Sequence, residues 1–187
     1  LQIANRKIFV SHHAQKLSNQ PDPKIANFLE ARTHEQPIKK ILFIDDRVPH
    51  PTIGSGFPRA HAILLSLRRL NCFVTCYPMF FINEDWSSAY SDLPQEVEII
   101  LGAGHLSLQK FLEERKDFYD AVIISRSPNM EIIQQLRQKR EDLFQNMRII
   151  YDSEALFSMR DAQLRLSRGE QISDDETQKL IQKEIAL

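Results

Sequence analysis

Residues 41–59 read ILFIDDRVPHPTIGSGFPR, and this stretch decides the fold. A run of apolar residues ends in two carboxylates, and Gly54 and Gly56 stand just before a segment whose apolar residues recur at helical spacing over residues 60–70. Short apolar runs bounded by turn residues are typical of buried strands, and intervals of three and four are typical of helices. The stretch therefore predicts a strand, a loop and a helix in succession.

Four further apolar runs follow along the chain, at residues 73–77, 97–100, 121–124 and 148–151. Helical spacing recurs between them, at residues 106–112 and 132–143, whereas residues 85–93 predict a loop with one helical turn. Strands that alternate with helices form parallel sheets through right-handed crossovers. We therefore expect an α/β fold, a Rossmann-like three-layer αβα sandwich with a parallel sheet of about five strands in the order 3-2-1-4-5.

The two ends of the chain differ from this central pattern. Residues 1–38 are polar and interrupted by prolines, so they predict an extension or linker ahead of a domain at residues 39–187. Residues 154–168 and 174–185 predict helices, with Ser173 as the N-cap of the second. That last helix continues to the end of the chain without a stop signal, which favours a further domain beyond it.

Composition excludes several classes of protein. The chain has 187 residues, 42% of them apolar, and a net charge of -1, which suits one well-cored domain without a field that attracts nucleic acid or an anionic membrane. No apolar run reaches the roughly 20 residues of a membrane helix. Cys72 and Cys76 are expected to be buried reduced thiols, which favours a cytoplasmic protein.

The histidines give no metal-site pattern. We expect His61 to pack or cap on its own helix, and the others are scattered without the spacing of metal ligands: His12, His13, His34, His50 and His105. The sequence therefore predicts no metal.

The expected strand order places a crevice at the carboxyl ends of the strands, beside the loops at residues 45–59, 125–129 and 152–154. Backbone N–H groups of Gly54, Ser55 and Gly56, next to a helix start that contains Pro58, predict a phosphate site. The alternative is that these glycines only make the turn. Their distance from the strand differs from that of a dinucleotide-binding motif, so a simple NAD-binding domain is disfavoured.

From residue 40 to residue 165 the chain resembles the N-terminal domain of group-1 (family 4-like) glycosyltransferases of the GT-B fold. The similarity rests on residues 41–49, on Gly54-Ser55-Gly56 followed by Arg59, and on residues 74–75, 119–128 and 149–156. It implies metal-independent transfer of a hexose, with retention, from a nucleotide-sugar that serves as co-substrate in place of a cofactor. It also implies that a C-terminal Rossmann-like domain holds the donor nucleotide, so that this chain alone is inactive.

The same resemblance implies a role for the N-terminal domain in holding the acceptor, which is a sugar, a lipid or a protein. The glycine loop, Gly54, Ser55 and Gly56, then reaches the donor diphosphate across the cleft. Many relatives have histidine at the end of the fourth or fifth strand, where this chain has Ser125-Arg126 and Asp152.

Polar residues at the strand ends are the candidates for the remaining roles. Asp152 is the candidate acceptor-activating base, with a helix cap as the alternative. Arg126 and Arg59 predict contacts with a phosphate or an acidic acceptor, or else ion pairs, for Arg126 with Asp45 or Glu154. Asp45 and Asp46 either bind acceptor hydroxyls or order their loop, and Glu154 is expected to line the cleft.

Two other classes of protein compete with the transferase. A receiver domain of a phosphorelay would use Asp45 and Asp46 to hold magnesium, but Leu101-Gly102 stands where its phospho-acceptor aspartate is required, and no lysine follows the fifth strand. A non-catalytic protein-interaction domain would need no chemistry in the crevice. Exposed, unpaired amides in the loop from Arg47 to Gly56 would favour a ligand-holding loop over a structural one.

Overall fold

The computed structural model describes residues 2–22, 24, 27–33, 38–54, 56–153 and 157–187. The chain divides into two compact units, residues 1–38 and 39–187. Among its described residues the first unit holds the α-helices α1 (Gln2–His12), α2 (Ala14–Ser18) and α3 (Phe28–Thr33). Helices α1 and α2 bury none of their residues, and Ile3, Phe9 and Phe28 are exposed, so apolar packing within this unit is slight.

The second unit alternates strands with helices. Its strands are β1 (Lys40–Asp45), β2 (Phe73–Pro78), β3 (Glu98–Ile99), β4 (Ala121–Ser125) and β5 (Arg148–Asp152). Its helices are α4 (Phe57–Arg69), α5 (Trp86–Ala89), α6 (Gly104–Glu114), α7 (Ser127–Lys139), the 3-10 helix η2 (Glu141–Leu143), α8 (Phe157–Ser167) and α9 (Asp174–Ile185).

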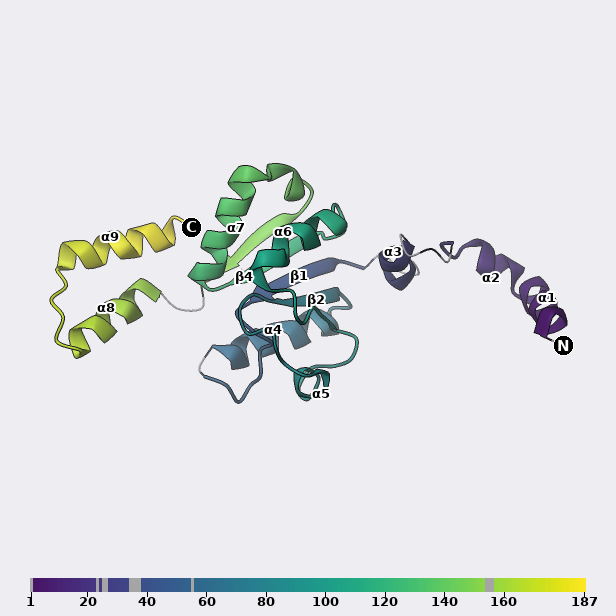
Figure 1. The fold of residues 1–187 in the computed structure, drawn as a ribbon, viewed down its shortest axis with the longest axis horizontal. Coiled ribbons are helices and arrows are strands. Elements are labelled where there is room, and N and C mark those ends of the chain that lie inside the picture. The colour runs from purple at the N-terminus through teal and green to yellow at the C-terminus, as the bar shows by residue number, and fades with distance from the viewer. Residues whose placement is uncertain (1, 23, 25–26, 34–37, 55, 154–156) are drawn as a thin grey trace. The chain divides into compact units, whose positions relative to one another are not determined.

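The five strands form one parallel sheet in the order β3-β2-β1-β4-β5, with β1 at its centre (Figure 1). The register pairs Ile44 with Tyr77 of β2 on one side and with Ile124 of β4 on the other. The expected fold class and strand order are therefore confirmed.

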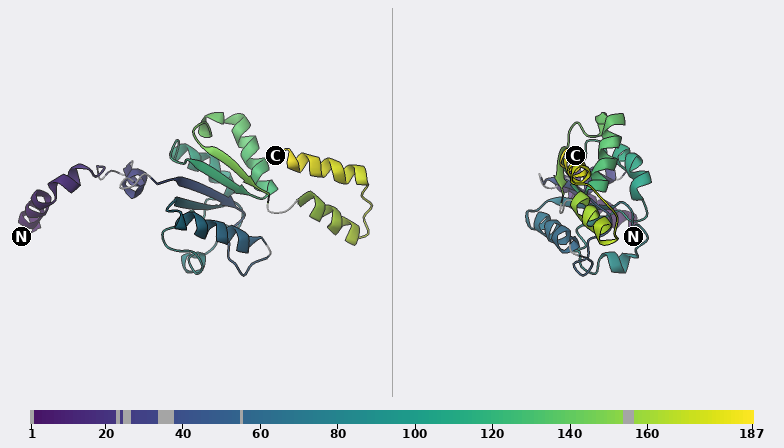
Figure 2. Two further views of the ribbon diagram at one scale, coloured as in Figure 1. Left: turned by 180° about the vertical axis from the view of Figure 1, so that it is seen from behind. Right: turned by 90° about the vertical axis from the view of Figure 1, so that its left-hand side faces the viewer.

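Helices cover both faces of the sheet (Figure 2), and each face has its own apolar core. Successive side chains of a strand point to opposite faces, so Leu42 and Ile44 pack toward α6 and α7, whereas Ile41 and Phe43 pack toward α4. Because β1 is buried on both faces it reads as a continuous apolar run, which is typical of a central parallel strand.

Several local features match the sequence, and others differ in length. Ser173 caps α9 by accepting a hydrogen bond from the amide of Glu176, as expected, and Cys72 and Cys76 are free and buried. Strand β3 has two residues instead of four, and it pairs only with β2 at the sheet edge. In the described part of the chain no helix has the length and apolar character that crossing a membrane requires.

Candidate functional site

The loops that follow β1, β4 and β5 meet at the carboxyl edge of the sheet. Asp45, Ser125 and Asp152 are the last residues of these three strands, and the register pairs Ser125 with Asp152. The winding of the sheet reverses between β1 and β4. Ligands of open α/β sheets bind in the crevice beyond such ends, so this edge is the candidate site.

A buried network of charged side chains fills the space between β1 and β4. Arg126 donates from Nε to Oδ1 of Asp45 at 2.7 Å, and the same nitrogen lies 3.5 Å from Oδ2 of Asp46. Asn129 donates to Oδ1 of Asp46 at 3.0 Å. The side chains of Asp45 and Arg126 are 0% and 8% exposed, so the ion pair weighed from the sequence for Arg126 is present, and Asp45 organises the edge from inside.

Arg126 has an unusual backbone that joins four elements. Its φ is 75°, a value that favours glycine and that side-chain-bearing residues adopt at a cost. Its amide donates to the carbonyl of Asp152 at 3.0 Å, and its guanidinium lies 4.3 Å from the centre of the Phe57 ring. Arg126 therefore holds β1, β5 and the starts of α4 and α7 together.

Burial changes the acid–base chemistry of this network. Burial raises the pKa of Asp45 to about 6, against the lowering effect of the ion pair and hydrogen bond with Arg126. Removing a carboxylate from water disfavours its charged form, and here that effect exceeds the attraction of the cation. Asp45 thus titrates near pH 6, above the usual range of an aspartate.

Asp152 and Arg59 form a second ion pair at the same edge. Arg59, in the first turn of α4, reaches Oδ2 of Asp152 at the end of β5. The Asp152 side chain is 12% exposed and that of Arg59 is 55% exposed. Arg59 therefore occupies one of the two carboxylate oxygens of Asp152. The alternative role of Asp152 as a helix cap falls on residues 154–156, where Glu154 also lies, and these are outside the described residues.

The glycine loop leads directly into α4. Gly54 is exposed with a φ of 59°, so this position requires a left-handed backbone, whereas Gly56 is the N-cap of α4 and has an ordinary φ of -89°. Ser55 is outside the described residues. No described acceptor takes the amide of Gly54, Gly56 or Phe57; within this loop Ile53 donates to the carbonyl of His50 at 3.2 Å.

Two helix N-termini converge beside this loop. Helices α4 and α7 each have proline in the first turn, and in the described part of the chain neither has a side-chain cap. Their starts touch, because Arg126 precedes α7 and packs on Phe57, the first residue of α4. Unpaired amides and aligned peptide dipoles give such ends a partial positive charge. Together with Arg59, this region suits a bound anion.

His50 has a role that the sequence did not indicate. Its Nδ1 lies 2.8 Å from Oδ2 of Asp92 and its Nε2 lies 2.6 Å from Oε1 of Glu84, and the ring is buried. His61, which was expected to pack or cap on its own helix, bonds through Nε2 to the carbonyl of Asp92 at 2.9 Å. These contacts fasten the loop after β1 and helix α4 to residues 84–92, partners too distant in sequence to be recognised from spacing.

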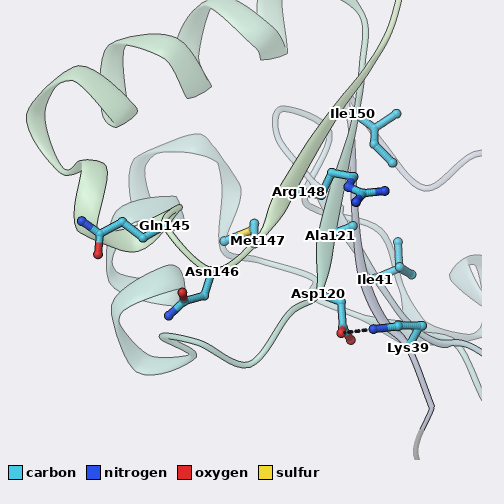
Figure 3. Close-up of a pocket in the computed structure, with 9 residues that line it drawn as sticks. All are labelled: Lys39, Ile41, Asp120, Ala121, Gln145, Asn146, Met147, Arg148 and Ile150. Atoms are coloured by element: carbon cyan, nitrogen blue, oxygen red, sulfur yellow. Dashed lines mark hydrogen bonds and ion pairs between the residues drawn. The ribbon is translucent and has the colours of Figure 1, made fainter.

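A pocket of about 600 Å³ lies at the opposite, amino end of the strands (Figure 3). Ile41, Ala121 and Ile150 supply apolar walls, and Lys39 points toward Asp120, with which it forms an ion pair of 2.7 Å. No helix start contributes to its lining. This pocket therefore lacks the pair of helix N-termini that meet at the carboxyl edge.

Among the described residues no group of three or more histidine, cysteine or acidic side chains has the geometry of a metal site. Comparisons with protein-family models, with curated proteins and with solved structures found no match to this chain.

Proposed function

We propose that residues 39–187 form the N-terminal, acceptor-side domain of a GT-B glycosyltransferase that transfers a sugar from a nucleotide-sugar donor. The observation that carries the proposal is the group of amides at Gly54, Gly56 and Phe57, for which no described residue provides an acceptor, at the start of α4. They stand at the edge where ligands of this fold class bind. The sequence resemblance over residues 40–165 supports the same assignment.

The diphosphate of the donor would bind where α4 and α7 begin. Backbone amides and helix dipoles stabilise a phosphate without a metal ion, and the exposed guanidinium of Arg59 adds a fork of donors that matches phosphate oxygens. This arrangement stabilises the charge that develops as the bond between the sugar and the diphosphate breaks. The donor-binding domain that the proposal requires would hold the nucleotide.

Asp152 would accept the proton of the acceptor hydroxyl as that oxygen bonds to the anomeric carbon. In the structure Asp152 is engaged by Arg59. A diphosphate that draws Arg59 toward itself would release Asp152, so donor binding would prepare the base. Asp45 and Arg126 would then act as positioning residues, because their side chains are buried.

A receiver domain is less consistent with the structure. Flavodoxin-like receivers have the strand order 2-1-3-4-5, whereas this sheet has the order 3-2-1-4-5. The guanidinium of Arg126 also lies between Asp45 and Asp46, where a receiver would hold its magnesium ion.

The test compares two glycines in the full-length gene product. Gly54→Val places a branched side chain in the loop, and the control Gly169→Val imposes similar backbone strain at a φ of 79° between α8 and α9. Release of nucleoside diphosphate from UDP-, GDP- and ADP-hexoses is measured in EDTA with a cell-extract acceptor. We expect Gly54→Val to lower turnover about a hundredfold and the control to leave it near wild type.

Absence of turnover with every donor in the wild-type protein, or equal losses in the two variants, would contradict the proposal. Thermal unfolding of both variants checks that valine at each positive-φ position lowers the free energy of unfolding by a similar amount, roughly 1–2 kcal/mol.

A further inference from the structure

A second recess lies at the carboxyl edge, on the segment that follows β2. It has a volume of about 390 Å³, and its walls include Arg47, Phe80, Phe81, Glu84 and Ser88. The amides of Phe80 and Phe81 both donate to the carbonyl of Asp46 at 3.0 Å. The recess therefore belongs to the same edge of the sheet as the proposed transfer site, yet none of the residues assigned to that site lines it.

Glu84 is held rigidly with one oxygen unused. Its Oε1 accepts from Ser88 at 2.7 Å and lies 2.6 Å from Nε2 of His50. Its Oε2 is buried and has no hydrogen-bond partner among the described residues, and the same is true of Nε of Arg47. Unpaired buried polar atoms are costly and infrequent, so a carboxylate oxygen and a guanidinium N–H just beneath the wall of one recess indicate an unseen polar ligand.

Aromatic rings stand exposed beside these polar atoms. Phe81 is 59% exposed and its ring centre lies 5.2 Å from the guanidinium carbon of Arg47, while Phe80 and Trp86 are 42% and 59% exposed. Exposed aromatic side chains grouped next to a few polar atoms are typical of ligand-binding surfaces. The recess thus combines an apolar ring face with an unpaired hydrogen-bond acceptor and an unpaired donor among its polar side chains.

A sugar ring matches this combination better than other ligands. Its C–H face packs against an aromatic ring, and its hydroxyls both donate to a carboxylate and accept from a guanidinium. An acidic peptide would be repelled by Glu84 and Asp85, and a lipid chain would bury the unpaired polar atoms without satisfying them.

We propose that the recess formed by Arg47, Phe81 and Glu84 is a subsite for one neutral sugar ring of a carbohydrate acceptor. Phe81 packs against the ring, Oε2 of Glu84 accepts from a ring hydroxyl, and Nε of Arg47 donates to a sugar oxygen. Both atoms are covered in this structure, so neighbouring side chains rotate when the sugar enters. The assignment as an acceptor subsite rests on the proposed function, whereas the binding of sugar does not.

The experiment uses Trp86, the only tryptophan in the sequence, which directly follows Asp85 of the recess lining in the chain. Tryptophan fluorescence of the whole chain is followed while methyl glycosides of glucose, galactose, mannose and N-acetylglucosamine are added without donor. We expect at least one to give a saturable change with a Kd on the order of millimolar, and Phe81→Ala to raise that Kd about tenfold. Glu84→Gln keeps one side-chain oxygen for His50 but loses the second oxygen, which accepts from the sugar hydroxyl, so we expect it to raise the Kd as well.

Phe28→Ala is the matched control, because Phe28 is 55% exposed and has a guanidinium, that of Arg32, 5.4 Å from its ring centre. Its Kd stays at the wild-type value. No saturable change with any glycoside up to about 100 mM, a hundredfold above a millimolar Kd, overturns the subsite. So do equal losses in Phe28→Ala and Phe81→Ala, or a fluorescence change with phosphatidylcholine vesicles and none with sugars.

This outcome is separable from that of the proposed function. Sugar binding without turnover of any nucleotide-sugar contradicts the transferase and leaves the subsite. Turnover without sugar binding contradicts the subsite alone.

Discussion

At the carboxyl end of the sheet Nε of Arg126 lies 2.7 Å from Asp45, and at the amino end Nζ of Lys39 lies 2.7 Å from Asp120. The first pair has side chains 8% and 0% exposed, and the second has side chains 73% and 37% exposed. Burial raises the pKa of Asp45 to about 6. Burial acts in the same direction on Asp120, but the hydrogen bonds from Lys39 and from the Lys40 amide hold its pKa below the ordinary value. Distance alone therefore does not decide what an ion pair contributes.

The two ion pairs should differ most in the free energy of unfolding that is lost when the cation of each is removed. Arg126→Met leaves Asp45 buried without its main partner, and we expect a loss of about 3–5 kcal/mol in the free energy of unfolding. Lys39→Met, the matched change at the exposed pair, should cost at most about 1 kcal/mol. Urea denaturation measures both. Equal losses would show that burial does not distinguish the two ends, and Asp45→Asn combined with Arg126→Met should recover part of the larger loss.

The pH dependence of stability should differ in sign between the two aspartates. Asp45 titrates near 3.8 when unfolded and near 6 when folded, so between these values the folded state binds more protons and stability falls as pH rises. The stability that Asp45 contributes is fully present below its unfolded pKa and is lost as the pH rises through its folded pKa. The difference between the two pKa values corresponds to a change of roughly 3 kcal/mol in the free energy of unfolding across this pH range. Asp45→Asn should abolish this pH-dependent change.

Asp120 supplies the opposite case. Its pKa is lowered in the folded state, so its contribution is present above the unfolded value and is lost as the pH falls through the folded one. The effect is smaller because water screens this pair. Urea denaturation at a series of pH values, on the wild type, Asp45→Asn and Asp120→Asn, measures both. The interpretation fails if wild type and Asp45→Asn lose stability in parallel between about pH 4 and about pH 7.

Local patterns in the sequence predicted the sheet better than they predicted the site. Residues 41–44 are apolar because β1 is covered on both faces, and the helical spacing after it gave the crossovers and the strand order. His50 contacts Glu84 and Asp92, which lie 34 and 42 positions further along the chain. The local periodicity of a sequence cannot predict contacts at such separations.

The direction of individual side chains was also beyond local patterns. Asp45, Arg126 and Asp152 were recognised as strand-end residues, but whether each faces a ligand or another side chain depends on packing between loops. The positive φ of Arg126 is a further example, because an arginine in the sequence does not predict a left-handed backbone. The sequence therefore located the edge and left its internal pairing open.

The smallest expected effect is that of Arg59→Ala, which tests whether the burial of an ion pair or its place at the carboxyl edge decides its contribution to stability. Arg59 pairs with Asp152 at the carboxyl edge, yet its side chain is 55% exposed and so resembles Lys39 more than Arg126. Arg59→Ala should therefore change the free energy of unfolding by less than about 1 kcal/mol in urea denaturation, as Lys39→Ala should. A loss as large as that of Arg126→Met would mean that the carboxyl edge as a whole, and not the burial of one pair, holds the sheet ends together. A small loss would leave Arg59 able to exchange Asp152 for a diphosphate at little cost to the fold, which is the movement that the proposed transfer requires.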